Sequence, residues 1–344
     1  MAASVKEVVD GVFRLTTSRA EQFAEVVSRV HCYLIELSDG KFALVDSGWA
    51  SSSSELIAAI RNEFGEGIKI ERLILTHLHP DHFGGTKVIV GNYSSKVSYH
   101  RKETLHLNAY YNVLRNGKRS AQFWLGFPTD VLETVQVTVN ANRSLLPEPD
   151  SYLTEGEKIR ARSGSWRIIH TPGHSPGHVC LYRPSDGTLI SGDHILPGET
   201  SNVAYYPVPG YSALRSYLAS LAKVDKLAPS AALPGHGNVI GDVARRIETI
   251  TAHHRERLKE VYRSLQWGER SVSEVTSSVK WSRGSYESLG QVNRWLAVLE
   301  TISHLEFLVE CGVVRKVAGP ERKYALTGHD WSGVDEAVGR IQRT

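Results

Sequence analysis

Cysteine is scarce in this sequence, and the few cysteines are dispersed. The 344-residue chain contains three of them, Cys32, Cys180 and Cys311. Their odd number and wide separation argue against a disulfide framework. No two of them form a C-x-x-C pair, which argues against a cysteine-based zinc site. We therefore expect buried thiols in a reducing, cytoplasmic setting.

Long apolar runs are also missing, and neither sign of charge dominates. No stretch is long enough to span a membrane, and the first residues, "MAASVKEVVDGVFRL", lack the apolar core of a signal peptide. We expect no membrane association. The 40 basic and 37 acidic residues give a net charge of +3. This balance neither favours nor excludes a nucleic-acid partner, because a local patch can still exist.

Residues 1–245 alternate between predicted strands and helices. Short apolar runs predict strands within 8–48, with the turn "SDGK" closing a hairpin. Residues 51–64 predict a helix, and "IERLILTH" predicts a buried strand after it. This rhythm indicates a layered α/β fold, in the broad sense that includes α+β. We expect a catalytic domain over 1–245, with a helical insertion at about 101–150.

Residues 246–344 predict a different unit, a linker helix followed by a small domain. A short helix in "RSVSEVTSSVKW" precedes a long helix in "QVNRWLAVLETISHLEFLVECGVV" and a hairpin in "RKVAGPERKYALT". Leu296, Leu299 and Ile302 lie on one apolar face of the long helix, and Gly312 stands where a helix C-cap is expected. This order resembles a winged helix.

The stretch "THLHPDH", residues 76–82, carries the densest group of potential metal ligands. In extended backbone, His77 and His79 point the same way, because side chains repeat every two residues. Pro80 keeps His79 extended, since the residue before a proline avoids the helical region. Asp81 and His82 then begin a new turn and can face a second point. One short stretch can thus serve two metals.

Three further polar residues follow predicted strands and adjoin glycines, namely His174, Asp193 and His236. Glycine allows sharp turns and close approach of a ligand. The candidate metal ligands are therefore His77, His79, Asp81, His82, His174, Asp193 and His236. Imidazole and carboxylate donors without thiolate suit zinc, and less selectively iron or manganese.

With "LVDSG", "THLHPDH", "TPGHSPGH", "SGDH" and "PGHG" in this order, the chain resembles the metallo-β-lactamase superfamily, within it the glyoxalase II-like hydrolases. The resemblance covers residues 8 to about 245. It implies an αββα sandwich with two zinc ions at one edge, between the sheets. His77, His79 and His174 would hold one ion, Asp81, His82 and His236 the other, and Asp193 would bridge them. Asp46 would orient ligands or the bridging water from behind.

Two of these residues distinguish between groups within the superfamily. The diiron flavoproteins of the superfamily have glutamate where this chain has His79, so hydrolytic zinc chemistry is favoured over electron transfer. The β-lactam-cleaving members generally lack the aspartate that stands here at Asp193, which argues against antibiotic hydrolysis. The implied reaction is attack by a hydroxide held between two ions, about 3.5–4 Å apart. Asp193 would place that hydroxide, and Asp81 would help to protonate the leaving group.

The substrate is predicted from weaker features. Residues 104–127 suggest a lid, and aromatic side chains there and after Asp193 would suit an apolar acyl group. The candidate substrate contacts are Tyr110, Tyr111, Trp124, Phe127, Tyr205 and Tyr206. We therefore favour a small acyl substrate, which would be a thioester, an ester or a lactone.

Three alternatives stay open. The C-terminal segment resembles the winged-helix domain of the lactamase-beta-like proteins, which include a single-strand-specific endoribonuclease, and Arg315, Lys316, Arg322 and Lys323 would stand in its wing. A mononuclear iron dioxygenase shares the fold and part of the ligand set. Alternatively, the C-terminal domain only packs against the rest or forms a homodimer.

Overall fold

The first half of the chain forms a seven-stranded sheet in the computed structural model, which describes residues 3–18, 29–115, 145–282 and 284–343. The strands lie side by side in chain order, antiparallel from β1 to β4 and parallel from β4 to β7. They are β1 (Ser4–Val9), β2 (Val12–Ser18), β3 (Arg29–Glu36), β4 (Phe42–Val45), β5 (Ile70–Ile74), β6 (Lys96–His100) and β7 (Ser151–Leu153).

A second sheet of five strands packs against the first. Its order is β12-β11-β10-β9-β8, and only the β11–β12 pair is parallel. The strands are β8 (Lys158–Ala161), β9 (Gly164–His170), β10 (Val179–Arg183), β11 (Thr188–Gly192) and β12 (Ala231–Pro234). All residues of β10 and β11 are buried, as expected for strands covered on both faces.

Alternation along the strands divides the apolar side chains into layers. In β3, Tyr33 and Ile35 face the space between the sheets, whereas Leu34 lies in the core beneath the outer helices. In β9, Ile168 faces the other sheet and Ile169 faces the helices on the opposite side. The burial pattern therefore gives the order helix, sheet, sheet, helix, which confirms the predicted αββα sandwich.

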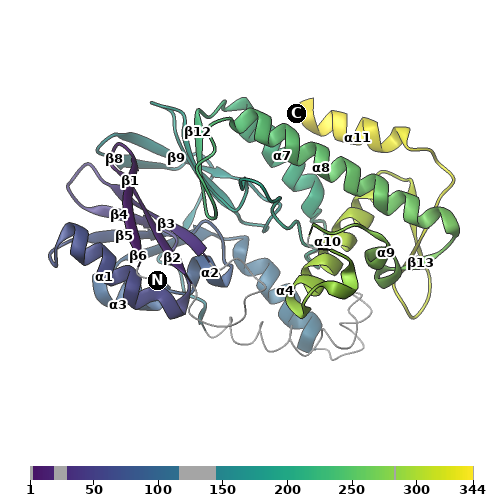
Figure 1. The fold of residues 1–344 in the computed structure, drawn as a ribbon, viewed down its shortest axis with the longest axis horizontal. Helices are drawn as coiled ribbons and strands as arrows, with labels where there is room; N and C mark the ends of the chain where they lie inside the picture. Colours follow the sequence, from purple (N-terminus) through teal and green to yellow (C-terminus); the bar gives the residue numbers. More distant parts are fainter. Residues whose placement is uncertain (1–2, 19–28, 116–144, 283, 344) are drawn as a thin grey trace.

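The outer helices come from the segments that show helical spacing. On the first sheet lie η1 (Ala50–Ser52), α1 (Ser53–Phe64) and α3 (Thr86–Tyr93), with the short α2 (Pro80–Phe83) before α3. On the second lie α7 (Ala213–Lys226) and α8 (Val243–Ser264), the latter extending toward the C-terminal part (Figure 1). Within the described ranges, no helix is both long and apolar enough to cross a bilayer.

The C-terminal segment has the predicted order of short helix, long helix and hairpin. Its elements are η2 (Leu265–Trp267), β13 (Arg270–Ser271), α9 (Val272–Ser278), η3 (Tyr286–Ser288), α10 (Gln291–Glu310), β14 (Val314–Val317), β15 (Lys323–Leu326) and α11 (Ser332–Arg343). The hairpin and β13 form a three-stranded sheet in the order β13-β15-β14. A further helix, α11, was not predicted from the sequence and packs on α7.

One apolar core runs across the predicted boundary at residue 245. It continues from the outer face of β10 and β11 through α7 and α8 to α10 and α11. The boundary itself falls in the first turn of α8. The C-terminal segment is thus packed onto the second sheet's helices, and its assignment as a separate winged-helix domain stays a prediction.

Of the predicted helical insertion, the structure describes α4 (Glu103–Arg115) and the residues from 145 onward. Trp124 and Phe127 lie outside the described residues, and so does most of the predicted lid.

Candidate metal centre

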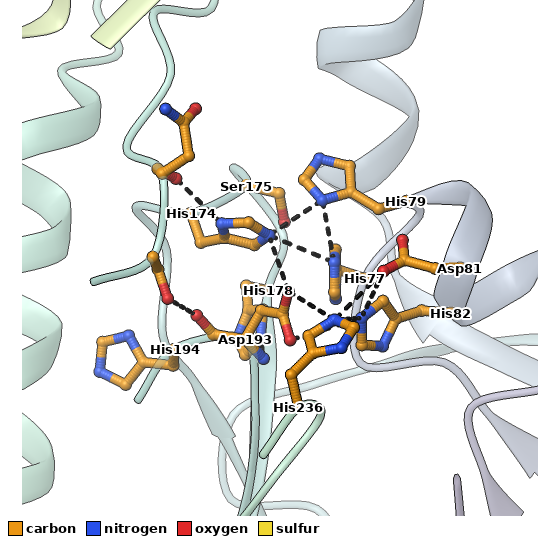
Figure 2. Close-up of polar contacts among 12 residues, drawn as sticks. His77, His79, Asp81, His82, His174, Ser175, His178, Asp193, His194 and His236 are labelled. Atoms are coloured by element: carbon orange, nitrogen blue, oxygen red, sulfur yellow. Dashed lines mark hydrogen bonds and ion pairs between the residues drawn. The ribbon is translucent and has the colours of Figure 1, made fainter. Parts of the chain in front are cut away.

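The polar loops at the carboxyl ends of the strands meet at one edge of the sandwich. Asp46 follows β4, the "THLHPDH" stretch follows β5, His174 lies between β9 and β10, Asp193 follows β11 and His236 follows β12. Figure 2 shows the other six predicted ligands gathered around Asp193. The structure therefore brings together every residue that the sequence suggested as a ligand.

Local backbone conformation divides the first stretch between two points. His79 is extended, with φ −95° and ψ 147°, and Pro80 begins α2. Asp81 and His82 therefore lie in a helical turn, as the position of the proline predicts. Three groups of side chains result whose potential ligand atoms converge: His77 with His79 and His174, Asp81 with His82 and His236, and His77 with His82 and Asp193.

The first sub-site consists of His77, His79 and His174. The His79 Nδ1 atom lies 3.0 Å from His77 Nε2 and 2.9 Å from His174 Nε2, and the two Nε2 atoms are 3.3 Å apart. Burial lowers the pKa of both His77 and His174, so these imidazoles are neutral near pH 7. Three nitrogens at this spacing fit a single ion with zinc–nitrogen bonds of about 2.0–2.1 Å.

The second sub-site consists of Asp81, His82 and His236. The His236 Nε2 atom lies 3.1 Å from Asp81 Oδ2 and 3.4 Å from His82 Nε2. Burial lowers the pKa of His236, but Asp193 and Asp81 outweigh it and raise that pKa to about 10. In the metal-free chain, protons on His82 and His236 thus balance the carboxylates, a role that a bound cation would take over.

Asp193 lies between the two sub-sites. Its Oδ2 atom is 3.7 Å from His174 Nε2 and 3.5 Å from His236 Nε2, and its Oδ1 atom is 3.4 Å from His82 Nε2. Oδ1 is buried, and no hydrogen bond from the described residues reaches it. A buried carboxylate oxygen in this state fits a metal ligand.

The outward nitrogens of the ligand histidines are held by acceptors. His174 Nδ1 donates to the Asn202 carbonyl at 2.9 Å, His236 Nδ1 to the Arg29 carbonyl at 2.5 Å, and His82 Nδ1 to Asp46 Oδ2 at 2.8 Å. With Nδ1 fixed in this way, the Nε2 atom of each ring faces the cluster, and on His82 and His236 a bound ion would replace the Nε2 proton.

Asp46 organises the loop that carries His77. Its carboxylate accepts the Thr76 backbone N–H at 2.7 Å and the Thr76 hydroxyl at 2.8 Å. The hydroxyl proton is thereby used, so Thr76 Oγ1 accepts from His77 Nδ1, 3.0 Å away. Asp46 adopts φ +61°, which is uncommon for a residue other than glycine. It occupies the supporting position that the resemblance implies, behind the ligands.

His178 is a supporting residue that is not among the predicted site residues. It is fully buried, and its Nε2 accepts the backbone N–H of Asp193 at 3.2 Å while its Nδ1 lies 2.9 Å from Thr171 Oγ1. A Cβ on Gly192 would lie 2.8 Å from that Nε2 atom. The sequence signal for this residue is the second histidine of "TPGHSPGH".

The predicted substrate contacts are only partly described. Tyr206 is buried, and its hydroxyl donates to the His174 carbonyl at 2.6 Å. The backbone N–H of Tyr205 donates to the Leu299 carbonyl of α10 at 3.0 Å. Tyr110 and Tyr111 lie in α4, at positions where no side chain is described. Contact of any of these residues with substrate stays a prediction, but Tyr206 is placed to support His174.

The C-terminal segment reaches the centre through Asn202. The Asn202 side chain donates to Glu300 Oε2 at 2.9 Å and to the Leu296 carbonyl at 3.3 Å, both on α10. Its backbone carbonyl holds His174, as described above. Helix α10 therefore lies two hydrogen bonds away from a ligand of the first sub-site.

Comparison with known proteins gives the same superfamily as the sequence motifs. The family model described as "Metallo-beta-lactamase superfamily" matches residues 26–236. The chain is 27% identical over 244 residues to the probable metallo-hydrolase YflN of Bacillus subtilis, covering 67% of this chain and 85% of that one. It is 26% identical over 275 residues to the acyl-coenzyme A thioesterase MBLAC2 of Gallus gallus, covering 77% and 92%.

Solved structures extend the likeness beyond the matched region. A beta-lactamase domain protein from Burkholderia ambifaria superposes with a TM-score of 0.78 at 25% identity, covering 94% of each chain. A metallo-beta-lactamase family protein from Thermus thermophilus gives 0.70 at 26% identity, covering 93% of this chain and all of that one. The clustered histidines and aspartates can hold divalent metal ions. Together with the family match, this shows that the chain belongs to the metallo-beta-lactamase superfamily and is a hydrolase of that superfamily.

Proposed function

We propose that the chain is a dinuclear zinc-dependent hydrolase of small acyl thioesters. The observation that carries the proposal is the position of Asp193, whose carboxylate faces one sub-site of three histidines and another of Asp81, His82 and His236. When bound there, paired divalent ions supply Lewis acidity and lower the pKa of a water to about 7. Three free cysteines suit a reducing compartment such as the cytoplasm.

The residues of the chain have separate roles in this proposal. Asp46, Asn202 and Arg29 orient imidazoles through the hydrogen bonds described above. Asp193 sets the spacing between the sub-sites. Asp81 is half-buried, with Oδ2 3.1 Å from His236 Nε2, and it would help to protonate the leaving group.

A thioester fits a site of this kind better than an amide does. A thiol has a pKa of about 8.5, so a thiolate can leave with little protonation. An amide nitrogen must be protonated as it leaves, which demands a strong general acid. The relative from Gallus gallus carries the name of an acyl-coenzyme A thioesterase. Both considerations favour thioesters among the acyl substrates.

The charges of the hairpin favour a small substrate over RNA. Lys316 Nζ and an Arg322 Nη atom lie 2.7 and 2.6 Å from the Glu306 carboxylate. Arg315 lies 3.4 Å from Glu269, and Lys323 lies 3.5 Å from Glu321. The Arg322 side chain is only 9% exposed. Side chains that are already paired with carboxylates offer less charge to phosphates.

The test is a turnover screen of the zinc-loaded full chain. It should cover acyl-CoA and glutathione thioesters, lactones, aryl esters and a short single-stranded RNA. We expect thioesters to give the highest kcat/KM, and Asp193→Ala to lower that value by more than about 100-fold. Cleavage of RNA alone would overturn the substrate class. One bound iron per chain with oxygen uptake would overturn the hydrolytic mechanism.

A further inference from the structure

Glu103 is a buried carboxylate that is not among the predicted site residues. It is the first residue of α4, and its relative accessible surface is 0%. It belongs to none of the groups of potential metal ligands found among the described residues. Its position is nevertheless next to the centre, between two of the ligand loops.

The two oxygens of Glu103 accept hydrogen bonds from different loops. Oε2 accepts the backbone N–H of Leu78 at 2.7 Å. Oε1 accepts the backbone N–H of Gly177 at 2.7 Å and the hydroxyl of Ser175 at 2.5 Å. Leu78 stands between His77 and His79 in the chain, whereas Ser175 directly follows His174.

These loops belong to different sheets. The Leu78 loop leaves β5 of the first sheet, and the loop of Ser175 and Gly177 joins β9 to β10 of the second. The first sub-site takes His77 and His79 from one loop and His174 from the other. A single carboxylate thus joins the loops that must stay in register for three nitrogens to converge.

The loop of Gly177 packs closely against Glu103. A Cβ on Gly177 would lie 2.6 Å from the Glu103 backbone nitrogen and 2.9 Å from its Cγ atom. The loop must therefore carry glycine at this point for the carboxylate to approach. Burial raises the pKa of Glu103 to about 7 although all three hydrogen bonds lower it. Burial of this carboxylate is costly, and a position that only fills space would not require it.

We infer that Glu103 is a positioning residue that fixes the distance between the two ligand loops of the first sub-site. The inference rests on the metal-dependent activity proposed above. It assigns no contact between Glu103 and substrate or metal. Its effect passes through the backbone of Leu78 and Gly177 to the imidazoles on either side.

Glu103→Gln tests this role with little change of shape. The amide oxygen can still accept from Ser175 and Gly177, but the amide NH2 group then faces the Leu78 N–H, so donor opposes donor. Glu306→Gln is the matched control, since it alters a largely buried carboxylate on α10 that bonds Arg322 and Tyr324. Both variants are compared in the full chain, without substrate.

Two measurements are needed, zinc affinity by competition with a chelator and the absorption spectrum of the cobalt-loaded protein. Because altered supporting partners cost about 10–100-fold in metal affinity, we expect E103Q to bind the ion of the first sub-site at least about 10-fold more weakly. Its cobalt spectrum should change as well. E306Q should keep wild-type affinity and spectrum, whatever it loses in stability.

Wild-type zinc affinity and spectrum in E103Q would overturn the inference and leave the proposed function standing. A wild-type chain that binds metal but hydrolyses no thioester would overturn the proposed substrate class alone. A wild-type chain that binds no metal would overturn both. If E103Q does not fold, Ser175→Ala decides, because it removes one of the three bonds. A decrease in zinc affinity of about 2- to 5-fold supports the role, and an unchanged affinity overturns it.

Discussion

Two groups of buried charged side chains differ in how their charge is balanced. In the centre around Asp193, two carboxylates and five imidazoles converge, and every ion pair within it joins a histidine to an aspartate. In the group around Glu306, the carboxylate bonds Lys316, Arg322 and Tyr324 directly. The first group becomes neutral only by taking up protons or cations. The second already contains its own cations.

This difference separates a site from a structural network. Burial raises the pKa of Glu306, but Arg322 and Lys316 outweigh it and lower that pKa. Arg322 also lies over the ring of Tyr205, 4.6 Å from its centroid, so the network ties the hairpin to the segment after Asp193. Buried charge alone is therefore a poor indicator of function. The informative feature is a buried carboxylate whose partners are histidines, which are charged only when protonated, and not lysine or arginine.

Removal of the metal should have the largest effect, and it should act on the centre around Asp193 and not on the group around Glu306. An ion that binds only the folded chain stabilises it by about 4 kcal/mol at a concentration 1,000 times its Kd. We expect a chelator to abolish turnover and to lower the free energy of unfolding by about this amount. E306Q should respond to the chelator as the wild type does. Equal stability with and without zinc, by urea denaturation, would contradict a metal centre.

Replacement of the bridging carboxylate should have the next largest effect. Asp193→Ala removes the group that faces both sub-sites, so we expect zinc content to fall to about one ion per chain. Turnover should fall by more than about 100-fold, since even supporting partners cost 10–100-fold. Elemental analysis and kcat/KM on the same preparation measure both. Two zinc ions retained in D193A would show that Asp193 does not bridge.

Glu306→Gln should lower the free energy of unfolding but leave zinc content and kcat unchanged. The substitution removes the carboxylate charge that faces the Arg322 guanidinium, a side chain that is 9% exposed. Breaking a buried pair costs about 3–5 kcal/mol, and the partial exposure of Glu306 reduces this to about 2 kcal/mol. Chemical denaturation measures that loss. Zinc content and kcat should stay at wild-type values, and a loss of zinc would mean that the two groups are coupled.

A pair of buried histidines between α8 and α10 provides the prediction with the smallest expected effect. His254 Nδ1 lies 3.2 Å from His304 Nε2 between α8 and α10, and burial lowers the pKa of His304 to about 3. An unfolded histidine titrates near 6.5, so the folded chain binds fewer protons between about pH 3 and 6.5. Stability is therefore present above pH 6.5 and is lost as the pH falls through this range.

His304→Gln removes one such group. Between pH 6.5 and 5.5, the wild type should lose about 1 kcal/mol more than H304Q in the free energy of unfolding. Urea denaturation of both proteins without metal isolates the difference, because all other histidines are shared. Parallel pH curves would mean that His304 has the same pKa in the folded and the unfolded chain, and would contradict the lowered value.

The sequence was most informative for potential metal ligands that follow predicted strands. The seven ligands could be predicted because each follows a strand, and because Pro80 divides "THLHPDH" between an extended segment and a turn. Likewise, the alternation of strand-like and helix-like segments was enough to predict a layered α/β fold, and the resemblance to the superfamily added the order of its layers.

Hydrogen-bond and ion-pair partners that meet only in the folded chain could not be predicted from the sequence. Glu103 bonds backbone N–H groups of two loops that are 25 and 74 residues away, and backbone donors carry no sequence signal. Arg322 looked like an exposed residue of a wing, but Glu306 lies 16 residues earlier on a helix that folds back against it. Only the packed structure shows which charges meet.

Anomalous diffraction at the zinc edge, on crystals of the zinc-loaded full chain, tests the bridged dinuclear centre most directly. We predict two peaks about 3.5–4 Å apart, one beside His77, His79 and His174 and the other beside Asp81, His82 and His236, with Asp193 between them. A single peak in one sub-site, or peaks that Asp193 does not contact, would contradict the account.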